Sequence, residues 1–183
     1  VLSAYNFTVE NKPGTSHKLL PKDGSVKLNP ITTRLGVLVL AGPNSRKVLQ
    51  KLTSTDLSNE AFPWLSGQAI SVGHTSCHAL RVNFVGELGF EFHHPIEQQV
   101  ALFDLLMEAG KEFGIRPYGI KAMSSLSIEK SYRLVPRELS IEYSAYESGL
   151  DRFVHPNKGQ FLGRDALVAG REKGLNWNFV TME

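Results

Sequence analysis

The stretch from His78 to Pro95, HALRVNFVGELGFEFHHP, constrains the fold of this chain more than any other part of the sequence. Two runs of alternating apolar residues lie on either side of Gly86-Glu87-Leu88-Gly89. Alternation with a period of two indicates β-strands, and a short glycine-containing connection between strands is ordinary hairpin chemistry. The sequence therefore predicts an antiparallel hairpin that carries the Glu87 carboxylate on its turn.

Glu87 has two interpretations at this point. Glycine on both sides relieves the steric limits on the backbone and lets a ligand approach the main chain, while the flanking strands fix the direction of the Glu87 side chain. A carboxylate held in this way can bind a ligand. A solvated hairpin tip that tolerates an acid explains the same residues, and this stretch alone does not decide between the two.

The remaining apolar patterns predict a mixed domain. Gly36 begins a buried strand, VLVLAGP, and Asn44 or Ser45 then begins a helix. Further strands are expected at 69–72, 77–84 and 89–94, and further helices at 96–113 and 119–133. This order is typical of an α+β domain in which helices cover one face of an antiparallel sheet, and a ferredoxin-like split βαβ arrangement is its simplest form.

The distribution of turn residues suggests three parts. Residues 1–35 contain Pro and Gly in every apolar run, which favours an extended arm that completes a neighbouring lobe. Residues 36–135 form the central α+β domain. Residues 136–183 are irregular, with short strands expected at 149–154 and 176–182, and are expected to return to the first lobe. Because the chain begins with Val, we expect it to be a processed or excised piece of a larger protein.

Composition excludes several classes of function. A chain of 183 residues with 42% apolar content can bury one good core or two small lobes. The net charge is +2 and no long run of Lys or Arg occurs, so nucleic acid is not an expected partner. No window approaches the roughly 18 consecutive apolar residues of a membrane span. Phe62 and Trp64, in a polar connection, are expected to fill the core.

Cysteine and histidine give little support for redox or metal chemistry. The single cysteine, Cys77, cannot form an internal disulfide, which favours a reducing compartment: the cytoplasm, or the mitochondrial matrix in a eukaryote. Cys77 lies in an apolar run, so we expect a buried, inert thiol. His93 and His94 are adjacent in a strand and point to opposite faces, which disfavours a metal site. The motifs G-x-S-x-G and G-x-G-x-x-G are absent, which disfavours hydrolase and nucleotide chemistry.

Four segments together resemble one family. In order they are GVLVLAGPNSRKVLQKL, ALRVNFVGELGFEFHHP, GIKAMSSLSIEKSYR and AYESGLDRFVHPNKGQFLGRDAL. This order resembles the glycine-cleavage T-protein (aminomethyltransferase) fold over roughly residues 34 to 175, and most of all the folate-binding region of dimethylglycine and sarcosine dehydrogenases. The resemblance implies tetrahydrofolate as the cofactor and one-carbon transfer as the activity. It also implies that FAD belongs to a flavin domain or subunit outside this chain, which would be the partner, and that residues 136–183 lead towards a C-terminal barrel outside this chain.

The resemblance assigns roles to individual residues. It maps the Gly-Glu pair that anchors the pterin onto Gly86 and Glu87, and a carboxylate can accept the two adjacent N–H donors of a pterin edge at once. Phe84 stands where many members have a Tyr, and can keep the stacking contact but not the hydroxyl. Arg81 matches the arginine that precedes the anchor, although a structural ion pair is an equal alternative. Glu147 is a weaker candidate for lining the pocket.

Two departures leave the function open. Ser127 stands where members often have an arginine near the folate site, and no residue here matches the family's catalytic aspartate, so the catalytic residues are unknown. One hypothesis is a tetrahydrofolate-binding part of a one-carbon transfer enzyme, which accepts a methylene group from an oxidised methylamine such as dimethylglycine or sarcosine. The alternative is a catalytically inactive folate-binding or subunit-contact module of the same fold.

Overall fold

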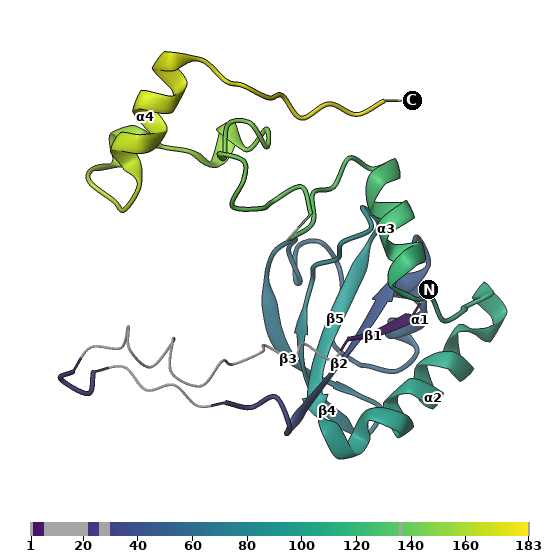
Figure 1. Cartoon of the computed structure of the whole chain (residues 1–183). Coiled ribbons are helices and arrows are strands. Elements are labelled where there is room, and N and C mark those ends of the chain that lie inside the picture. Colours follow the sequence, from purple (N-terminus) through teal and green to yellow (C-terminus); the bar gives the residue numbers. More distant parts are fainter. Residues whose placement is uncertain (1, 6–21, 26–29, 136, 183) are drawn as a thin grey trace. The chain divides into compact units, whose positions relative to one another are not determined.

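The computed structural model describes residues 2–5, 22–25, 30–135 and 137–182 (Figure 1). The chain divides into two compact units, Val1–Met123 and Ser124–Glu183, here called unit 1 and unit 2. Most of the predicted N-terminal arm, residues 6–21 and 26–29, lies outside the described residues. The predicted division into 1–35, 36–135 and 136–183 stays a prediction.

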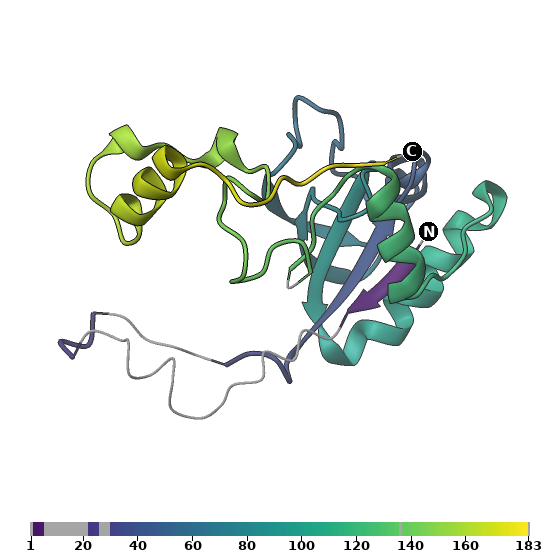
Figure 2. The ribbon, with the colours of Figure 1, turned by 45° about the horizontal axis from the view of Figure 1, so that its top comes forward.

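Unit 1 contains a five-stranded antiparallel sheet (Figures 1 and 2). Its strands are β1 (Leu2–Tyr5), β2 (Leu35–Ala41), β3 (Gly67–Val72), β4 (Thr75–Leu80) and β5 (Gly89–Pro95), in the order β1-β2-β5-β4-β3. Leu38 of β2 is in register with Phe92 of β5, which is in register with Ala79 of β4. The predicted α+β class with an antiparallel sheet is confirmed.

Helices pack on one face of this sheet. Unit 1 contains α1 (Ser45–Gln50), η2 (Ile96–Gln98), α2 (Gln99–Gly110) and η3 (Lys111–Phe113), and α3 (Ile120–Glu129) spans the boundary between the units. Leu49 of α1 and Leu102 and Leu106 of α2 belong to the same buried cluster as Leu38 and Phe92. Because alternate strand residues point to one face, these contacts place α1 and α2 together on the face that carries Leu38.

The core of unit 1 explains why the apolar runs fold as they do. Both Val39 and Leu40 are buried, as expected for a strand that is covered on two faces. Phe62 is fully buried, with its ring centroid 5.6 Å from that of Phe90, so its predicted core role is confirmed. Trp64 is 66% exposed, so the prediction for this residue is wrong. Leu65 adopts a positive φ of 61°, so the chain turns directly after Trp64.

The connectivity differs from a split βαβ unit in one respect. The strands that α1 joins, β2 and β3, run in opposite directions and have β5 and β4 between them. In a split βαβ unit the two strands joined by the helix run in the same direction. β2 and β3 run in opposite directions because β3, β4 and β5 form a continuous antiparallel meander, and β5, its last strand, pairs with β2.

Unit 2 is mostly irregular. Its regular elements are the C-terminal part of α3, η4 (Asp151–Phe153), η5 (Pro156–Lys158) and α4 (Arg164–Lys173). Within the described part of unit 2 there is no strand, so the strands predicted at 149–154 and 176–182 are wrong. A strand requires a ladder with a neighbouring strand, and here the N–H of Phe179 donates instead to the carbonyl of Glu147 in a loop, 3.0 Å away. None of the helices in the described ranges is long and apolar enough to cross a membrane.

Candidate functional site

The connection between β4 and β5 is a loop, residues 81–88, which is longer than the connection expected between strands at 77–84 and 89–94. Asn83 organises this loop: its Oδ1 accepts hydrogen bonds from the N–H groups of Val85, at 2.9 Å, and Glu87, at 3.2 Å. Its Nδ2 donates to the carbonyl of Glu87. Side-chain bonds of this kind replace strand pairing, because they give the backbone an alternative to the ladder. Glu87 therefore stands on a backbone that is fixed at both its N–H and its carbonyl.

The two glycines of the loop have different roles. Gly86 has a φ of 71°, in the left-handed region that glycine adopts without strain. Gly89 is required for another reason, because a Cβ there would lie 2.8 Å from the Cβ of Asn83 and 3.3 Å from the carbonyl oxygen of Leu40. Gly86 thus permits the turn, and Gly89 permits the close packing of the loop on β2.

The end of the loop is also attached to the start of α1. The carbonyl of Leu88 accepts hydrogen bonds from the N–H of Gly42, at 2.8 Å, and from the hydroxyl of Ser45, at 3.0 Å. These bonds connect the predicted Gly-Glu motif to the strand-to-helix junction that the sequence also predicts.

Three side chains of the loop have different environments. Val85 is 3% exposed and anchors the loop in unit 1, whereas Phe84 is 40% exposed and Glu87 is half-buried. An exposed aromatic ring and a half-buried carboxylate on one fixed loop can offer stacking and hydrogen-bond acceptance to a planar ligand. The predicted pterin contacts of Glu87, Gly86 and Phe84 stay predictions.

Arg81, at the start of the loop, makes structural hydrogen bonds. Its Nη1 donates to the carbonyl of Phe62, at 2.6 Å, and its Nη2 donates to Oδ1 of Asn59, at 2.8 Å. Nη2 of Arg46 donates to the same Asn59 oxygen, at 2.7 Å. Burial, and then the positive charge of Arg46, lower the pKa of Arg81, which Glu60 partly offsets. Arg81 therefore ties the loop to the connection that carries Phe62.

Glu147 belongs to unit 2, whereas Glu87 belongs to unit 1. Oε2 of Glu147 accepts a hydrogen bond from the N–H of Ser144, at 2.9 Å, and Oε1 of Glu147 accepts one from the N–H of Asn176, at 3.2 Å. Hydrogen bonds from Ser144 lower the pKa of this carboxyl, and smaller contributions come from the backbone of Asn176 and Trp177. The carboxylate thus joins the 144–147 turn to the C-terminal segment.

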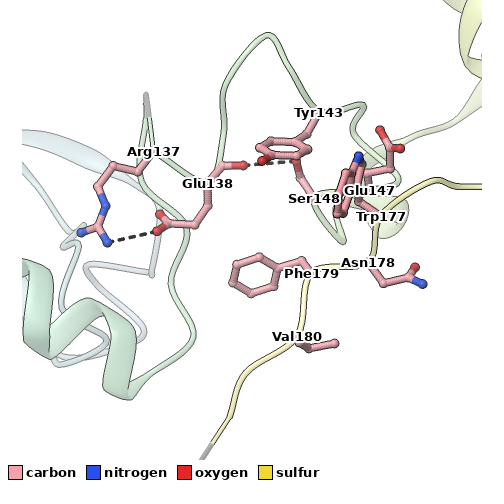
Figure 3. A pocket seen from close by; sticks show the side chains of 9 residues that line it. All are labelled: Arg137, Glu138, Tyr143, Glu147, Ser148, Trp177, Asn178, Phe179 and Val180. Atoms are coloured by element: carbon pink, nitrogen blue, oxygen red, sulfur yellow. Dashed lines mark hydrogen bonds and ion pairs between the residues drawn. The ribbon is translucent and has the colours of Figure 1, made fainter.

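A cavity of about 510 Å³ lies in unit 2, and Glu147 is one of its lining residues (Figure 3). Figure 3 shows the rings of Tyr143, Trp177 and Phe179 around a hollow, and the Glu138 carboxylate directed away from them towards Arg137. The full lining is Arg137, Glu138, Tyr143, Glu147, Ser148, Trp177, Asn178, Phe179 and Val180. Aromatic residues within irregular segments at 143 and 177–179 are the signal that could have indicated it.

The histidines of β5 contact neighbouring side chains of unit 1, and the cysteine of β4 is buried. Nε2 of His93 lies 2.8 Å from Oε1 of Glu91, and His94 is fully buried, with Nε2 2.8 Å from Oε1 of Gln99. Cys77 is 3% exposed, and burial raises the pKa of its thiol to about 11. A thiol with this pKa is protonated at neutral pH, which agrees with the predicted inert role.

The fold and the loop between β4 and β5 define an α+β domain with a glycine-flanked carboxylate at one end of its sheet. The chain belongs to the GCVT N-terminal domain family, which matches residues 7–158. This confirms the predicted family resemblance.

Several curated relatives are similar over most of the chain. The mitochondrial dimethylglycine dehydrogenase of Homo sapiens is 42% identical over 158 residues, which cover 86% of this chain and 18% of that protein. The aminomethyltransferase of Thermoanaerobacter pseudethanolicus is 36% identical over 86% of this chain and 43% of that protein. The mitochondrial sarcosine dehydrogenase of Homo sapiens is 40% identical over 81% of this chain and 17% of that protein. The chain thus spans less than a fifth of the two dehydrogenases and less than half of the aminomethyltransferase.

Proposed function

We propose that this chain is the tetrahydrofolate-binding part of a one-carbon transfer enzyme, which accepts a methylene group from an oxidised methylamine such as dimethylglycine or sarcosine. One observation carries the proposal: in a chain of this family, Asn83 fixes the backbone on which Glu87 stands, at both the N–H and the carbonyl. A carboxylate on a fixed loop is suited to orienting a ligand.

The side chains of the loop fit a reduced pterin. A pterin presents two adjacent N–H donors on its amino-pyrimidinone edge, and the Glu87 carboxylate would accept both in a charge-assisted pair. The exposed ring of Phe84 would pack against the pterin face. Gly86 would let the ligand approach the main chain, because it has no side chain at this turn.

The contribution of the chain to the reaction is positioning. When bound, tetrahydrofolate supplies a nucleophilic nitrogen that takes up the one-carbon unit. Glu87 would orient the pterin, and Asn83 and Arg81 would hold the loop that carries Glu87. We assign proton transfer to no residue of this chain. Glu147 is proposed to support the walls of the cavity in unit 2, since both of its carboxylate oxygens already accept backbone hydrogen bonds.

The proposed partner is a flavin domain or subunit that oxidises the methylamine and lies outside this chain, so that FAD is not bound here. We further propose a reducing compartment, the cytoplasm or the mitochondrial matrix, in keeping with the one buried cysteine.

Calorimetric titration of tetrahydrofolate under reducing conditions tests the proposal. Glu87→Gln keeps the size of the side chain but removes its charge, and should weaken binding by about 1.5 to 3 kcal/mol, which is about tenfold or more in affinity. Glu97→Gln, at an exposed position in η2, is the matched control and should bind as the parent chain does. Equal affinity of the parent chain and Glu87→Gln would remove Glu87 from the site.

A catalytically inactive module is the second candidate function. The observation that favours it is the complete burial of Ser127, a small uncharged residue at the position where family members often carry an arginine. Turnover distinguishes the active enzyme from the inactive module. If the first proposal is right, the longer protein of which this chain is proposed to be a part should convert a methylamine donor and tetrahydrofolate to methylene-tetrahydrofolate. If that longer protein binds folate and forms no product, the chain is a catalytically inactive module.

A further inference from the structure

The strand β3 lies at one edge of the sheet, and among the described residues no strand pairs with its outer side (Figure 1). From this edge we propose an interaction surface for a second copy of this chain. The two β3 strands pair antiparallel, with Ala69 opposite Ala69, so that the two sheets continue into one. The proposal depends neither on Glu87 nor on folate binding.

The register of the hairpin shows which backbone groups of β3 face outward. Val72 pairs with Thr75 across the two-residue turn between β3 and β4, and the pair that closes such a turn is hydrogen-bonded. Hydrogen-bonded pairs recur at every second residue of an antiparallel ladder. The N–H and C=O groups of Gly67, Ala69 and Ser71 therefore point away from β4.

Hydrogen bonds at the two ends of β3 agree with this direction. The N–H of Arg81 donates to the carbonyl of Ser66, at 2.9 Å, which continues the inner set. The N–H of Gly73 donates to the carbonyl of Leu52, at 2.7 Å, which lies outside the ladder. Within the described ranges, the outward backbone groups of residues 67, 69 and 71 have no hydrogen-bond partner. Unpaired groups in such a row are a template for a further strand.

The side chains of β3 do not protect this edge. Proteins commonly protect an edge strand with lysine, proline or an inward charge, and Gly67–Val72 contains no charged residue and no proline. The outward-facing residues Gly67, Ala69 and Ser71 are small and exposed. A cavity of about 520 Å³ separates residues 53–55 from residues 69–71, so the preceding connection leaves room beside the strand.

A second β3 matches this edge. With Ala69 on the twofold axis, Gly67 of one copy lies opposite Ser71 of the other, so every outward residue is paired and the facing side chains are small. No like charges oppose each other, because β3 is uncharged. Trp64 and Leu65 precede the strand and are both 66% exposed. In this register they lie beside the β3–β4 turn of the second copy and add apolar area to the contact.

Sedimentation equilibrium of the full chain tests the proposal. The measured mass should rise from 20.3 kDa towards twice that value as the concentration increases from about 1 μM to about 1 mM. Reducing conditions exclude a disulfide between two copies through Cys77.

Two variants change the edge and leave the ladder between β3 and β4 intact. Ala69→Pro removes an outward N–H at a position where an edge strand tolerates proline. Ala69→Lys places two like charges directly opposite each other. Each should weaken association at least about fivefold. Ser76→Lys adds the same charge at an exposed residue of β4, on the same face of the sheet but away from the edge, and should leave association unchanged.

An equimolar mixture of Ala69→Lys and Ala69→Glu tests the register. Opposite charges then face each other across the twofold axis, so the mixture should associate at least about threefold more tightly than either variant alone. A mixture that associates no better than the separate variants would overturn pairing about Ala69.

Three further results would overturn the proposal. They are a mass that stays at 20.3 kDa over the whole concentration range, association of both edge variants equal to that of the parent chain, or equal weakening by Ser76→Lys and Ala69→Lys. If Ala69→Pro loses the circular dichroism of the parent chain, Ala69→Lys and the mixture decide. Glu87→Gln should associate as the parent chain does, so this proposal and the folate proposal can fail separately.

Discussion

The two units hold their candidate sites in different ways. In unit 1 the loop 81–88 is attached to a sheet whose strands pair along their lengths, and its own backbone is fixed by Asn83. In unit 2 no sheet is present in the described residues, and the cavity is held by hydrogen bonds that backbone N–H groups donate to the carboxylates of Glu138 and Glu147.

This difference determines how firmly each unit fixes the side chains of its candidate site. A ladder and an apolar core fix many atoms cooperatively, so a side chain such as Glu87 can be oriented with little freedom. A site that depends on a few carboxylate bonds opens more readily, because each bond contributes separately and is exposed to solvent. Unit 1 is therefore suited to binding by directed hydrogen bonds, whereas the cavity of unit 2 depends on a few separate hydrogen bonds.

The largest expected effect breaks the core that supports unit 1. Phe90 is fully buried in β5, and its ring contacts that of Phe62. Phe90→Ala should lower the free energy of unfolding by about 3 to 5 kcal/mol, because it leaves a cavity in the core. Urea denaturation measures this, with Phe153→Ala in unit 2 as the control. Phe153 is 64% exposed, so its removal should change stability by less than about 0.5 kcal/mol. Comparable losses in the two variants would contradict the difference between the units.

The second effect concerns the buried thiol of unit 1. Burial raises the pKa of Cys77 from 9.0 to about 11, which means that folding favours the protonated thiol. Its contribution to stability is fully present below pH 9 and is lost as the pH rises through about 11. The loss should be of the order of 2 to 3 kcal/mol. Unfolding measured between pH 8 and 11 should show this loss in the parent chain and a smaller one in Cys77→Ala, where no thiol titrates. Parallel pH profiles would contradict a buried thiol.

The third effect sharpens the role of the loop itself. Asn83→Ala removes the acceptor for the N–H groups of Val85 and Glu87. We expect a loss of about 1 to 2 kcal/mol in stability, together with weaker folate binding although Asn83 itself is not proposed to touch the ligand. Asn83→Asp keeps an acceptor oxygen and should recover part of both. If Asn83→Ala binds folate as tightly as the parent chain, the fixed backbone is not what orients Glu87.

The same contrast explains how much of the molecule could be predicted from the sequence. The alternating runs around Gly86 and the buried run after Gly36 identified the strands and their antiparallel arrangement, because period-two patterns directly reflect burial on a sheet. The end of β4 at Leu80 was not predicted. Val82 and Phe84 continue the apolar pattern, but the side chain of Asn83 draws the backbone out of the ladder, and this competition depends on a three-dimensional bond.

The candidate sites show a similar division. The Gly-Glu pair was identified through the family resemblance, because a glycine-containing connection between strands is by itself ordinary hairpin chemistry. The cavity of unit 2 was not, because Tyr143 and Trp177 are far apart in sequence and are brought together by hydrogen bonds that the N–H groups of Asn176 and Phe179 donate to Glu147. Trp64 and Trp177 are exposed to nearly the same extent, so exposure alone does not identify Trp177 as a residue that lines the cavity of unit 2.

The smallest effect tests the bonds that hold unit 2. Hydrogen bonds from Ser144 and Asn176 lower the pKa of Glu147 below its ordinary value of 4.5, so the stability that this carboxylate contributes is present above that pH and is lost as the pH falls through the lowered pKa. Because Asn176 adjoins Trp177, the fluorescence of Trp177 in the Trp64→Phe background should change at pH values below 4.5 while the circular dichroism of unit 1 persists. Glu147→Gln should abolish this acid transition, since the amide does not titrate, whereas Glu142→Gln should retain it. An acid transition that survives in Glu147→Gln would mean that another group closes the C-terminal segment onto the 144–147 turn, and the cavity of unit 2 would then depend less on this carboxylate than its two hydrogen bonds indicate.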